Sequence, residues 1–309
     1  MRALLLSTCL MFATAANAEI LRVMSFNVWG GGGNEGKDVT ETVAAIKAAR
    51  ADVIGIQETR LEPEDCSAEV CAATGESVAK AIAAELGYYY YDQTQDNVAL
   101  WANSVISKFP IGASTAHDLG VPLDVNGTTV WLFNIHHDDE PYQPYQALGI
   151  EYGPAPFTKD PAELINWANT TRGPAMDLLF ADMTAASGII LVTGDFNEPG
   201  YGDWTAATVT AGQQPVAVDW PTTKRLADAG FIDAFRAIWP DPVAKPAFTW
   251  TARGDEKDPE DHHDRIDFVF VKGASVTDAA IVGENGARTD IAVDPWPSDH
   301  RAVVVEISF

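Results

Sequence analysis

The stretch of sequence that most clearly indicates chemistry is LVTGDFNEPG, residues 191–200. Its apolar residues predict a strand that ends in a tight turn at Gly194 and presents Asp195 and Asn197 side by side. A carboxylate at this position can orient an attacking water molecule or hold a metal ion. An amide can donate a hydrogen bond to an oxygen that gains charge as an ester breaks. The pair suits phosphate chemistry, whereas the alternative for an acid after a strand is a helix cap or a turn.

Similar polar residues follow other apolar segments of the chain. Eight of them are candidates for one site: Asn27, Glu58, His136, Asp195, Asn197, Asp267, Asp299 and His300. In a layered α/β protein the ends of the strands meet at one edge, so residues far apart in the sequence can share a pocket. Hydrolysis of a phosphate ester requires a divalent cation, an acid that activates water, and imidazoles that supply charge or a proton. The residue types for this chemistry are all present.

Patterns of apolar residues predict the elements that carry these side chains. We expect strands over 20–27, 52–57, 88–92, 98–101, 104–111, 128–135, 191–193, 248–251, 265–272, 275–283 and 302–307. We expect helices over 39–50, 76–86 and 222–229, and a long helix from residue 160 with a break at Gly173 and Pro174. This alternation favours one α/β domain that contains two sheets with helices outside them.

A long loop rich in aromatic residues, prolines and glycines is predicted over residues 140–157. It contains Tyr142, Tyr145, Tyr152 and Phe157. So many aromatic side chains in one loop indicate either a wall of the substrate site or a loop that packs on itself. The sequence favours neither alternative.

The segments SFN, IQE, NIH, GDFN, RID and SDH occur in this order along the chain. In order and spacing they resemble the endonuclease/exonuclease/phosphatase superfamily, which includes pancreatic-type deoxyribonucleases, abasic-site endonucleases, bacterial sphingomyelinases and inositol polyphosphate 5-phosphatases. The resemblance covers nearly the whole chain after residue 18. It implies a four-layered α/β sandwich, in which two mostly antiparallel central sheets are flanked by helices and the site lies at one edge.

The resemblance also implies a metal site. Glu58, with Asn27 beside it, matches the divalent-metal site of the family, and Asp299 matches an acid that lies near the metal in some members. The ion implied is Mg²⁺, with Mn²⁺ or Ca²⁺ as alternatives, and water and phosphate oxygens complete its coordination.

The remaining site residues match catalytic positions of the family. Asp195 matches the residue that orients or deprotonates the attacking water, and Asn197 matches the one that steadies the phosphoryl oxygens. His136 corresponds to a histidine that contacts the phosphate or donates a proton to the leaving group. His300 would contact the phosphoryl group and be oriented by an acid on the neighbouring strand.

Two acids in HDRIDFVFV could be the partner of His300. Alternation along an extended strand places Asp264 and Asp267 on opposite faces. The match of RIDFVF to the family pattern favours Asp267, and Asp264 would then be a turn residue.

The beginning of the chain is typical of a secretory signal peptide. Met1 and Arg2 give a positive start, residues 3–15 form an apolar core, and residues 16–18 (ANA) form a small-residue cleavage site. We therefore expect residues 1–18 to be removed, a single catalytic domain over residues 19–309, and a secreted or periplasmic protein. In an oxidising compartment Cys66 and Cys71 would form a local disulfide, with a metal site as the weaker alternative.

The charge balance is strongly acidic, with 20 Lys and Arg against 44 Asp and Glu and a net charge of −24. Such a field repels polyanions, so tight binding to DNA is disfavoured unless a metal or a local basic patch intervenes. Beyond the first eighteen residues no apolar run is long enough to cross a bilayer, which excludes an integral membrane protein.

The leading hypothesis is a secreted, metal-dependent hydrolase of a small or lipid-linked phosphate ester, acting as a phosphatase or phosphodiesterase and as a monomer. A secreted nuclease of the same superfamily is the alternative, because it would share every catalytic residue. A catalytically silent binding protein on the same fold is a third hypothesis. The completeness of the residue set argues against it.

Overall fold

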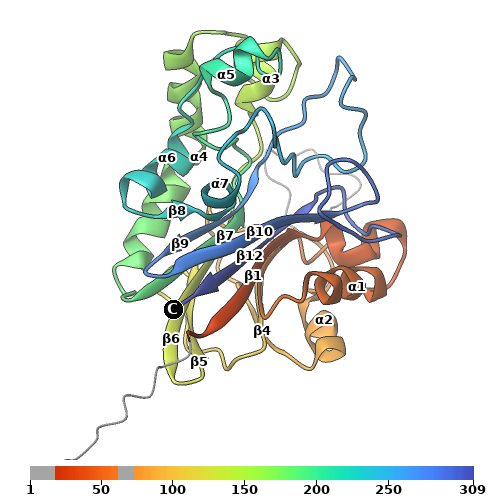
Figure 1. Ribbon diagram of the computed structural model, residues 1–309, viewed down its shortest axis with the longest axis vertical. Helices are drawn as coiled ribbons and strands as arrows, with labels where there is room; N and C mark the ends of the chain where they lie inside the picture. Colours follow the sequence, from red (N-terminus) through yellow and green to blue (C-terminus); the bar gives the residue numbers. More distant parts are fainter. Residues whose placement is uncertain (1–17, 62–72) are drawn as a thin grey trace, which may run out of the picture.

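Two β-sheets form the centre of the computed structural model, which describes residues 18–61 and 73–309 (Figure 1). The first sheet contains β1 (Ile20–Asn27), β2 (Val53–Gln57), β3 (Tyr89–Asp92), β4 (Ser104–Ser107), β10 (Ser275–Gly283), β11 (Ile291–Ala292) and β12 (Ala302–Ser308). The second contains β5 (Gly120–Val125), β6 (Thr128–His136), β7 (Ile189–Asp195), β8 (Ile232–Asp233) and β9 (Asp267–Lys272). Their strand orders are β11-β10-β12-β1-β2-β4-β3 and β5-β6-β7-β9-β8. Among these pairs β1–β2, β10–β11 and β6–β7 are parallel and the others antiparallel.

Helices cover the outer face of each sheet. On the first sheet α1 (Thr40–Ala49) and α2 (Ala79–Leu86) pack against apolar side chains of β1 and β2, and on the second α4 (Pro161–Met183) packs against β6, β7 and β9. In Figure 1 the helices α1 and α2 lie on one side of the sheets, and α4 and α6 (Pro221–Asp228) lie on the other. The shorter elements are η1 (Trp29–Glu35), α3 (Gln143–Leu148), α5 (Ala206–Thr210) and α7 (Ala234–Ile238). The chain is therefore a four-layered α/β sandwich with mostly antiparallel sheets, as the resemblance of its motifs implies.

Alternation along the strands explains which residues meet between the sheets. In β1, Leu21 and Val23 belong to the core between the two sheets, whereas Met24 and Phe26 belong to the core under the helices. The same period of two places Leu191 between the sheets and Val192 under α4. A residue at the end of a strand continues this alternation. Asn27 and Asp195 therefore point towards the opposite sheet.

A layer of buried polar side chains lies between this apolar core and the strand ends. Asn134 is its centre: its Nδ2 donates to the carbonyl oxygens of Ile56 and Ser104 and to Gln93 Oε1, each at 3.0 Å. Its Oδ1 accepts from Gln57 Nε2 at 2.6 Å. These bonds join β6 of the second sheet to β2 and β4 of the first. Because an unpaired polar group in such a place would be costly, they restrict how the two sheets can slide.

The side chains of Thr193 and Ser25 extend the layer across the same gap. Thr193 Oγ1 donates to Asn134 Oδ1 at 3.1 Å, and Ser25 Oγ accepts from the backbone N–H of Gly194 at 3.0 Å. Ser25 and Thr193 each precede a strand-end residue of the site by two positions and share its face. The layer thus lies directly beneath the site.

Glycine at position 55 allows this close approach of the sheets. A Cβ atom there would lie 1.8 Å from Thr193 Oγ1 and 2.6 Å from Asn134 Oδ1. Only a residue without a side chain fits between β2 and the polar layer.

Four predicted elements differ from the structure. Residues 98–101 form a turn rather than a strand, because Asn97 Oδ1 accepts from the N–H of Ala99 and stabilises the turn. Residues 248–251 make only isolated bridges at Trp250. The helix α4 continues through Gly173 and Pro174 without a break. The predicted loop at 140–157 contains α3, whose Tyr145 is buried.

The strand β5 has no counterpart in the sequence prediction. It lies at the edge of the second sheet beside β6, with a single bridge from Ile111 to Leu123 on its other side, and it contains Pro122, which is typical of an edge but obscures the strand pattern.

Gly55→Ala should lower the free energy of unfolding by about 2 to 3 kcal/mol, because the added methyl group must displace Thr193 and Asn134. Chemical denaturation measures the change. Gly202→Ala is the control, since a Cβ atom at Gly202 meets nothing within 4 Å. Equal stability of the two variants would show that the sheets can move apart at no cost.

Candidate active site

All eight candidate residues lie at one edge of the sandwich. Asn27, His136 and Asp195 end β1, β6 and β7, and Asp267 begins β9. In the second sheet His136 is the neighbour of Asp195, and Asp195 is the neighbour of Asp267. The remaining four candidates lie next to strand ends: Glu58 follows β2, Asn197 lies two residues after β7, and Asp299 and His300 lie just before β12.

Asn27 connects the two sheets within the site. Its Nδ2 donates to Glu58 Oε1 at 2.7 Å and to Asp195 Oδ2 at 3.0 Å. Its Oδ1 accepts from the backbone N–H of Trp29 at 3.1 Å, which fixes the orientation of the amide. One side chain from the first sheet thus holds together the two carboxylates that would bind a metal or activate water.

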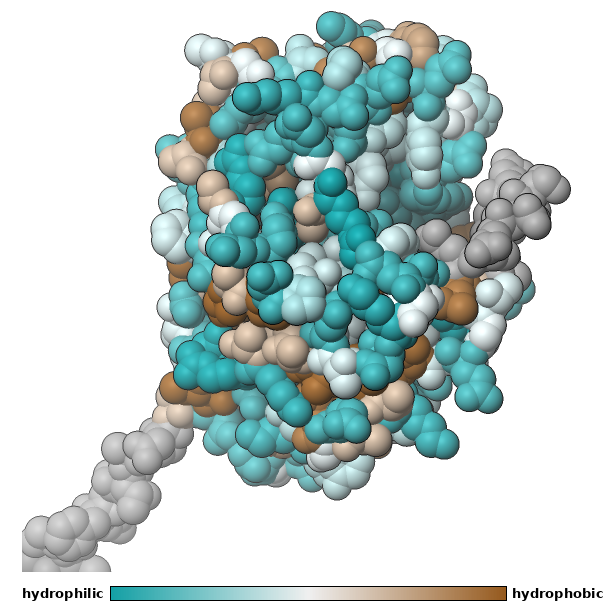
Figure 2. Space-filling view, turned by 90° about the vertical axis from the view of Figure 1, so that its right-hand side faces the viewer, coloured by the Kyte–Doolittle hydropathy of each residue, from teal (hydrophilic) through white to brown (hydrophobic). Residues whose placement is uncertain are grey.

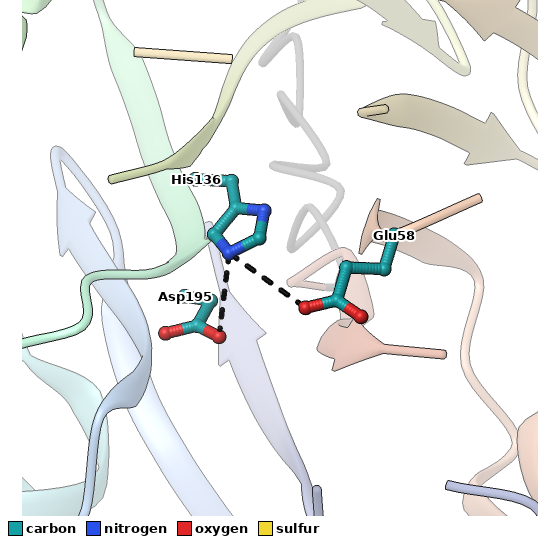
Figure 3. Close-up of side chains that lie close together, drawn as sticks. All are labelled: Glu58, His136 and Asp195. Carbon is teal, nitrogen blue, oxygen red and sulfur yellow. Dashed lines mark ion pairs between the residues drawn. The ribbon is translucent and has the colours of Figure 1, made fainter. Parts of the chain in front are cut away.

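His136 faces the same two carboxylates. Its Nε2 lies 3.8 Å from Glu58 Oε1 and 3.7 Å from Asp195 Oδ2 (Figure 3). Its Nδ1 lies 3.3 Å from the carbonyl oxygen of Trp101, which can only accept a hydrogen bond, so the Nδ1 atom carries a proton. Asn197 Nδ2 lies 3.3 Å from the same Nε2. The arrangement leaves Nε2 as the atom that can exchange a proton with a bound group.

His300 is held by Asp267. Its Nδ1 lies 2.9 Å from Asp267 Oδ2, and its Nε2 lies 3.6 Å from Asp195 Oδ2. Burial opposes a charge on this imidazole, but the carboxylates of Asp267 and Asp195 outweigh it and raise the pKa of His300 well above its usual value. Burial raises the pKa of Asp267 to about 6, against the opposite effect of His300. At neutral pH the pair is therefore an imidazolium held by a carboxylate.

Asp264, the alternative partner of His300, belongs to another cluster. Its Oδ1 accepts from Trp204 Nε1 at 2.8 Å, and its Oδ2 accepts from the hydroxyl of Tyr142 at 3.0 Å. The expectation that Asp264 is a turn residue is wrong. Its backbone forms an isolated bridge with Trp250, and its side chain is 1% exposed. A carboxylate can be buried there because the neighbouring N–H and O–H groups bind it.

Glu58 is the most strongly perturbed carboxylate at the metal-candidate end of the site. Burial and the nearby carboxylate of Asp299 raise its pKa from 4.5 to about 7, although His136 and Asn27 act in the opposite direction. Its backbone has φ of 53°, in the left-handed region that residues with side chains rarely adopt. Charge repulsion and an unusual backbone conformation at one residue are typical of a functional position.

The donor atoms fit a divalent cation. One atom each from Glu58, His136 and Asp195 lie within 4.8 Å of one another, and so do single atoms of Asp195, Asp267 and His300. Carboxylate oxygens are the ligands that Mg²⁺ and Mn²⁺ favour. A bound cation would compensate the repulsion that raises the pKa of Glu58, and it would neutralise charge on the oxygens of a phosphate ester.

The three predicted metal ligands differ in what their oxygen atoms contact. Glu58 lies in the first group of donor atoms, whereas Asn27 Oδ1 is engaged by the N–H of Trp29. Asp299 Oδ1 accepts from Ser298 Oγ at 3.4 Å and influences Glu58 through its charge. That Asn27, Glu58 and Asp299 bind the metal remains a prediction.

Three residues that support the site were not singled out in the sequence. Ser298 Oγ donates to the carbonyl oxygen of Asn27 at 2.8 Å and accepts from the N–H of His300 at 3.0 Å. Thr249 Oγ1 accepts from the N–H of Asp267 at 3.1 Å. The carbonyl of Trp101 orients His136. Ser298 could have been found from its place in SDH, whereas the other two lie in segments without a motif.

The fold and the cluster at its edge are those of a phosphoesterase or nuclease. The chain belongs to the endonuclease/exonuclease/phosphatase family, whose model matches residues 24–300. Members of this family are hydrolases that act on phosphoester bonds.

Individual relatives are distant. An uncharacterized protein of Caenorhabditis elegans is 26% identical over 307 residues, which cover 94% of this chain and 91% of that protein. The 3′-5′ exonuclease NExo from Neisseria meningitidis superposes with a TM-score of 0.55 at 16% identity, covering 94% of this chain and 100% of that one. An endonuclease/exonuclease/phosphatase protein from Beutenbergia cavernae superposes with a TM-score of 0.54 at 17% identity, covering 93% and 71%. These likenesses show the fold.

Glu58→Gln should stabilise the protein in a chelator. Between pH 4.5 and about 7 the folded protein keeps a proton on Glu58 that the unfolded chain releases, so folding is favoured as pH falls through this window. Above it the charged Glu58 costs up to about 3 kcal/mol, which the variant avoids. The melting temperature should therefore rise at about pH 8 and match that of the unchanged protein at about pH 4.5.

The exposed Glu76 supplies the control for this experiment. Glu76→Gln should leave the melting temperature unchanged at both pH values. A lower melting temperature of Glu58→Gln at about pH 8 would show that the charge of Glu58 stabilises the fold without a metal.

Proposed function

We propose that the protein is an exported, divalent-metal-dependent hydrolase that cleaves a small or lipid-linked phosphate ester by attack of water. The observation that carries this proposal is the position of Asp195. Its Oδ2 accepts from Asn27 and lies within 3.7 Å of an imidazole nitrogen on each side, from His136 and from His300. A buried carboxylate between two imidazoles can take a proton from water while the imidazoles bind the anion under attack.

The two histidines have different tasks in this proposal. His300, which Asp267 keeps charged, binds a phosphoryl oxygen through its Nε2–H and stabilises the charge that grows there. His136, with Nδ1 occupied by the Trp101 carbonyl, presents Nε2 to the leaving group. Asn197, whose Nδ2 is held by the His137 carbonyl at 2.9 Å, lies beside His136 and donates to the same phosphate.

The proposed export rests on residues 1–18, of which residues 1–17 lie outside the described part of the structure, as do Cys66 and Cys71. Their composition is that of a signal peptide. Among residues 18–61 and 73–309 no helix is long and apolar enough to cross a membrane. Hydrophilic residues cover most of the face in Figure 2, and apolar residues lie between them, chiefly in its lower half.

A panel of substrates tests the proposal and separates it from a nuclease. The purified chain, after removal of residues 1–18, is offered a simple phosphate monoester, a simple diester, sphingomyelin and duplex DNA, with Mg²⁺ and with a chelator. The net charge of −24 favours a substrate other than DNA. Chelator-sensitive turnover of one of the first three supports the proposal. Turnover of DNA alone replaces it with the nuclease, and turnover of none leaves a binding protein.

Asp195→Asn should lower kcat by about two to four orders of magnitude, because an amide cannot take a proton from water. The amide is of equal size and its one oxygen can keep the contact with Asn27 at the cost of the bond from the N–H of Asn197, so the fold should remain. Steady-state kinetics on the best substrate of the panel and circular dichroism check both parts. A variant with at least a tenth of the original kcat would exclude Asp195 as the base.

A further inference from the structure

Arg253 lies at the rim of the site, where it contacts Trp29, Glu35 and Ser298. Its guanidinium carbon lies 4.7 Å from the centre of the Trp29 ring, and its Nη1 forms an ion pair with Glu35 at 2.5 Å. Its Nε donates to the carbonyl oxygen of Ser298 at 3.3 Å. The carboxylate of Glu35, the ring of Trp29 and the carbonyl of Ser298 together hold the long side chain of Arg253 in one position.

These contacts tie Arg253 to two segments that carry site residues. Trp29 follows Asn27 by two residues and donates its N–H to Asn27 Oδ1. Ser298 precedes Asp299 and His300 in the chain, and its hydroxyl donates to the carbonyl of Asn27. Arg253 is therefore held by segments that also carry site residues, while Asn27 and Ser298 keep their own hydrogen bonds to the site.

The backbone before Arg253 is fastened to the same turn. Thr251 Oγ1 donates to the Asp299 carbonyl at 3.0 Å, and the N–H of Ala252 donates to that carbonyl at 2.6 Å. The N–H of Arg253 in turn donates to Thr251 Oγ1 at 3.1 Å. Both the backbone and the side chain of Arg253 are thus positioned before any substrate binds.

One of the three guanidinium nitrogens remains available. The Nη2 atom makes no hydrogen bond within residues 18–61 and 73–309, and the side chain is 37% exposed. Hydrogen bonds from Arg253 and Lys37 lower the pKa of Glu35 to about 2, so this carboxylate keeps its charge and its hold on Arg253. Two other arginines are fully engaged: Arg301 binds Glu284 and the Phe248 carbonyl, and Arg265 is buried between Asp203 and Asp233.

We propose that Arg253, stacked on Trp29, binds a second anionic group of the substrate, so that preferred substrates carry another phosphate beside the one that is cleaved. The inference rests on the proposed function for the identity of the first phosphate. A guanidinium with free N–H groups matches two phosphate oxygens at once. Arg253 contacts Trp29, Glu35 and Ser298, whereas the phosphate under attack would lie between Asp195, His136 and His300, so the two groups are separate.

Two matched substrates test this assignment. They are the nitrophenyl ester of thymidine monophosphate and the same ester with a second phosphate on the sugar, and release of nitrophenol is followed with Mg²⁺. Arg253→Gln should lower kcat/KM for the substrate with two phosphates about 10-fold or more, the usual effect of a lost hydrogen bond to a charged group. For the substrate with one phosphate the change should stay below about 2-fold. Arg253→Lys should also lose the preference for the substrate with two phosphates, because lysine keeps the positive charge but not the paired N–H donors of the guanidinium.

Arg288 offers a closely matched control. It forms an ion pair with Glu256 at 2.6 Å, its guanidinium carbon lies 5.1 Å from the Phe248 ring, and its side chain is 35% exposed. Arg288→Gln therefore removes an ion pair and a ring contact of the same kind away from the site. Its melting temperature should match that of Arg253→Gln, while its selectivity should be that of the unchanged protein.

A binding measurement separates this inference from the proposed function. Calorimetric titration in a chelator compares a nucleoside monophosphate with the matching bisphosphate. Tighter binding of the bisphosphate that is lost in Arg253→Gln and kept in Arg288→Gln supports the anion site, even if neither nitrophenyl ester is hydrolysed and the hydrolase proposal fails. Hydrolysis without a preference for the second phosphate, or an equal loss on both substrates in Arg253→Gln, overturns the anion site and leaves the hydrolase proposal standing.

Discussion

The hydrogen bonds between the two sheets beneath the site are the constraint on which the structure depends. Apolar side chains alone would allow the sheets to slide, because burial of apolar surface has no direction. Asn134 removes this freedom by using its amide on strands of the opposite sheet, and Gly55 leaves room for it. Since Asn27 and Glu58 belong to one sheet and Asp195 and His136 to the other, the register between sheets decides whether the site exists.

The site itself combines charges that the fold alone would not favour. Carboxylates and imidazoles are brought together out of water, and the pKa values of Glu58 and Asp267 rise in response to burial. At one end Asp267 and His300 satisfy each other as a pair. At the other end Glu58 lies close to Asp299, and its neighbours of opposite effect are the amide of Asn27 and the imidazole of His136. This imbalance is what a bound divalent cation would remove, and it indicates where the cation would be needed.

The sequence was sufficient to predict the four-layered fold and the set of residues at its edge, because strand ends and the family motifs both point to them. It could not establish which side chains contact each other within the site. Asp264 and Asp267 differ by three positions in one segment, and only the structure shows that Trp204 and Tyr142 bind the first and His300 binds the second. The polar layer is not evident from the sequence, although Ser25, Gln57 and Asn134 lie inside the motifs SFN, IQE and NIH. Their role depends on contacts between sheets, which periodicity along a single strand does not encode.

The orientation of His136 depends on a main-chain carbonyl, that of Trp101, rather than on a carboxylate side chain. No substitution can delete a carbonyl group, so this partner persists through any change of residue type at position 101. The turn that presents it is less tolerant: Ala102 has φ of 54°, and its carbonyl accepts from both the N–H and the hydroxyl of Thr59, directly after Glu58. The tautomer of His136 therefore depends on the conformation of this turn, while the Trp101 ring, whose centre lies 6.0 Å from that of the imidazole, makes a separate edge-on contact with it.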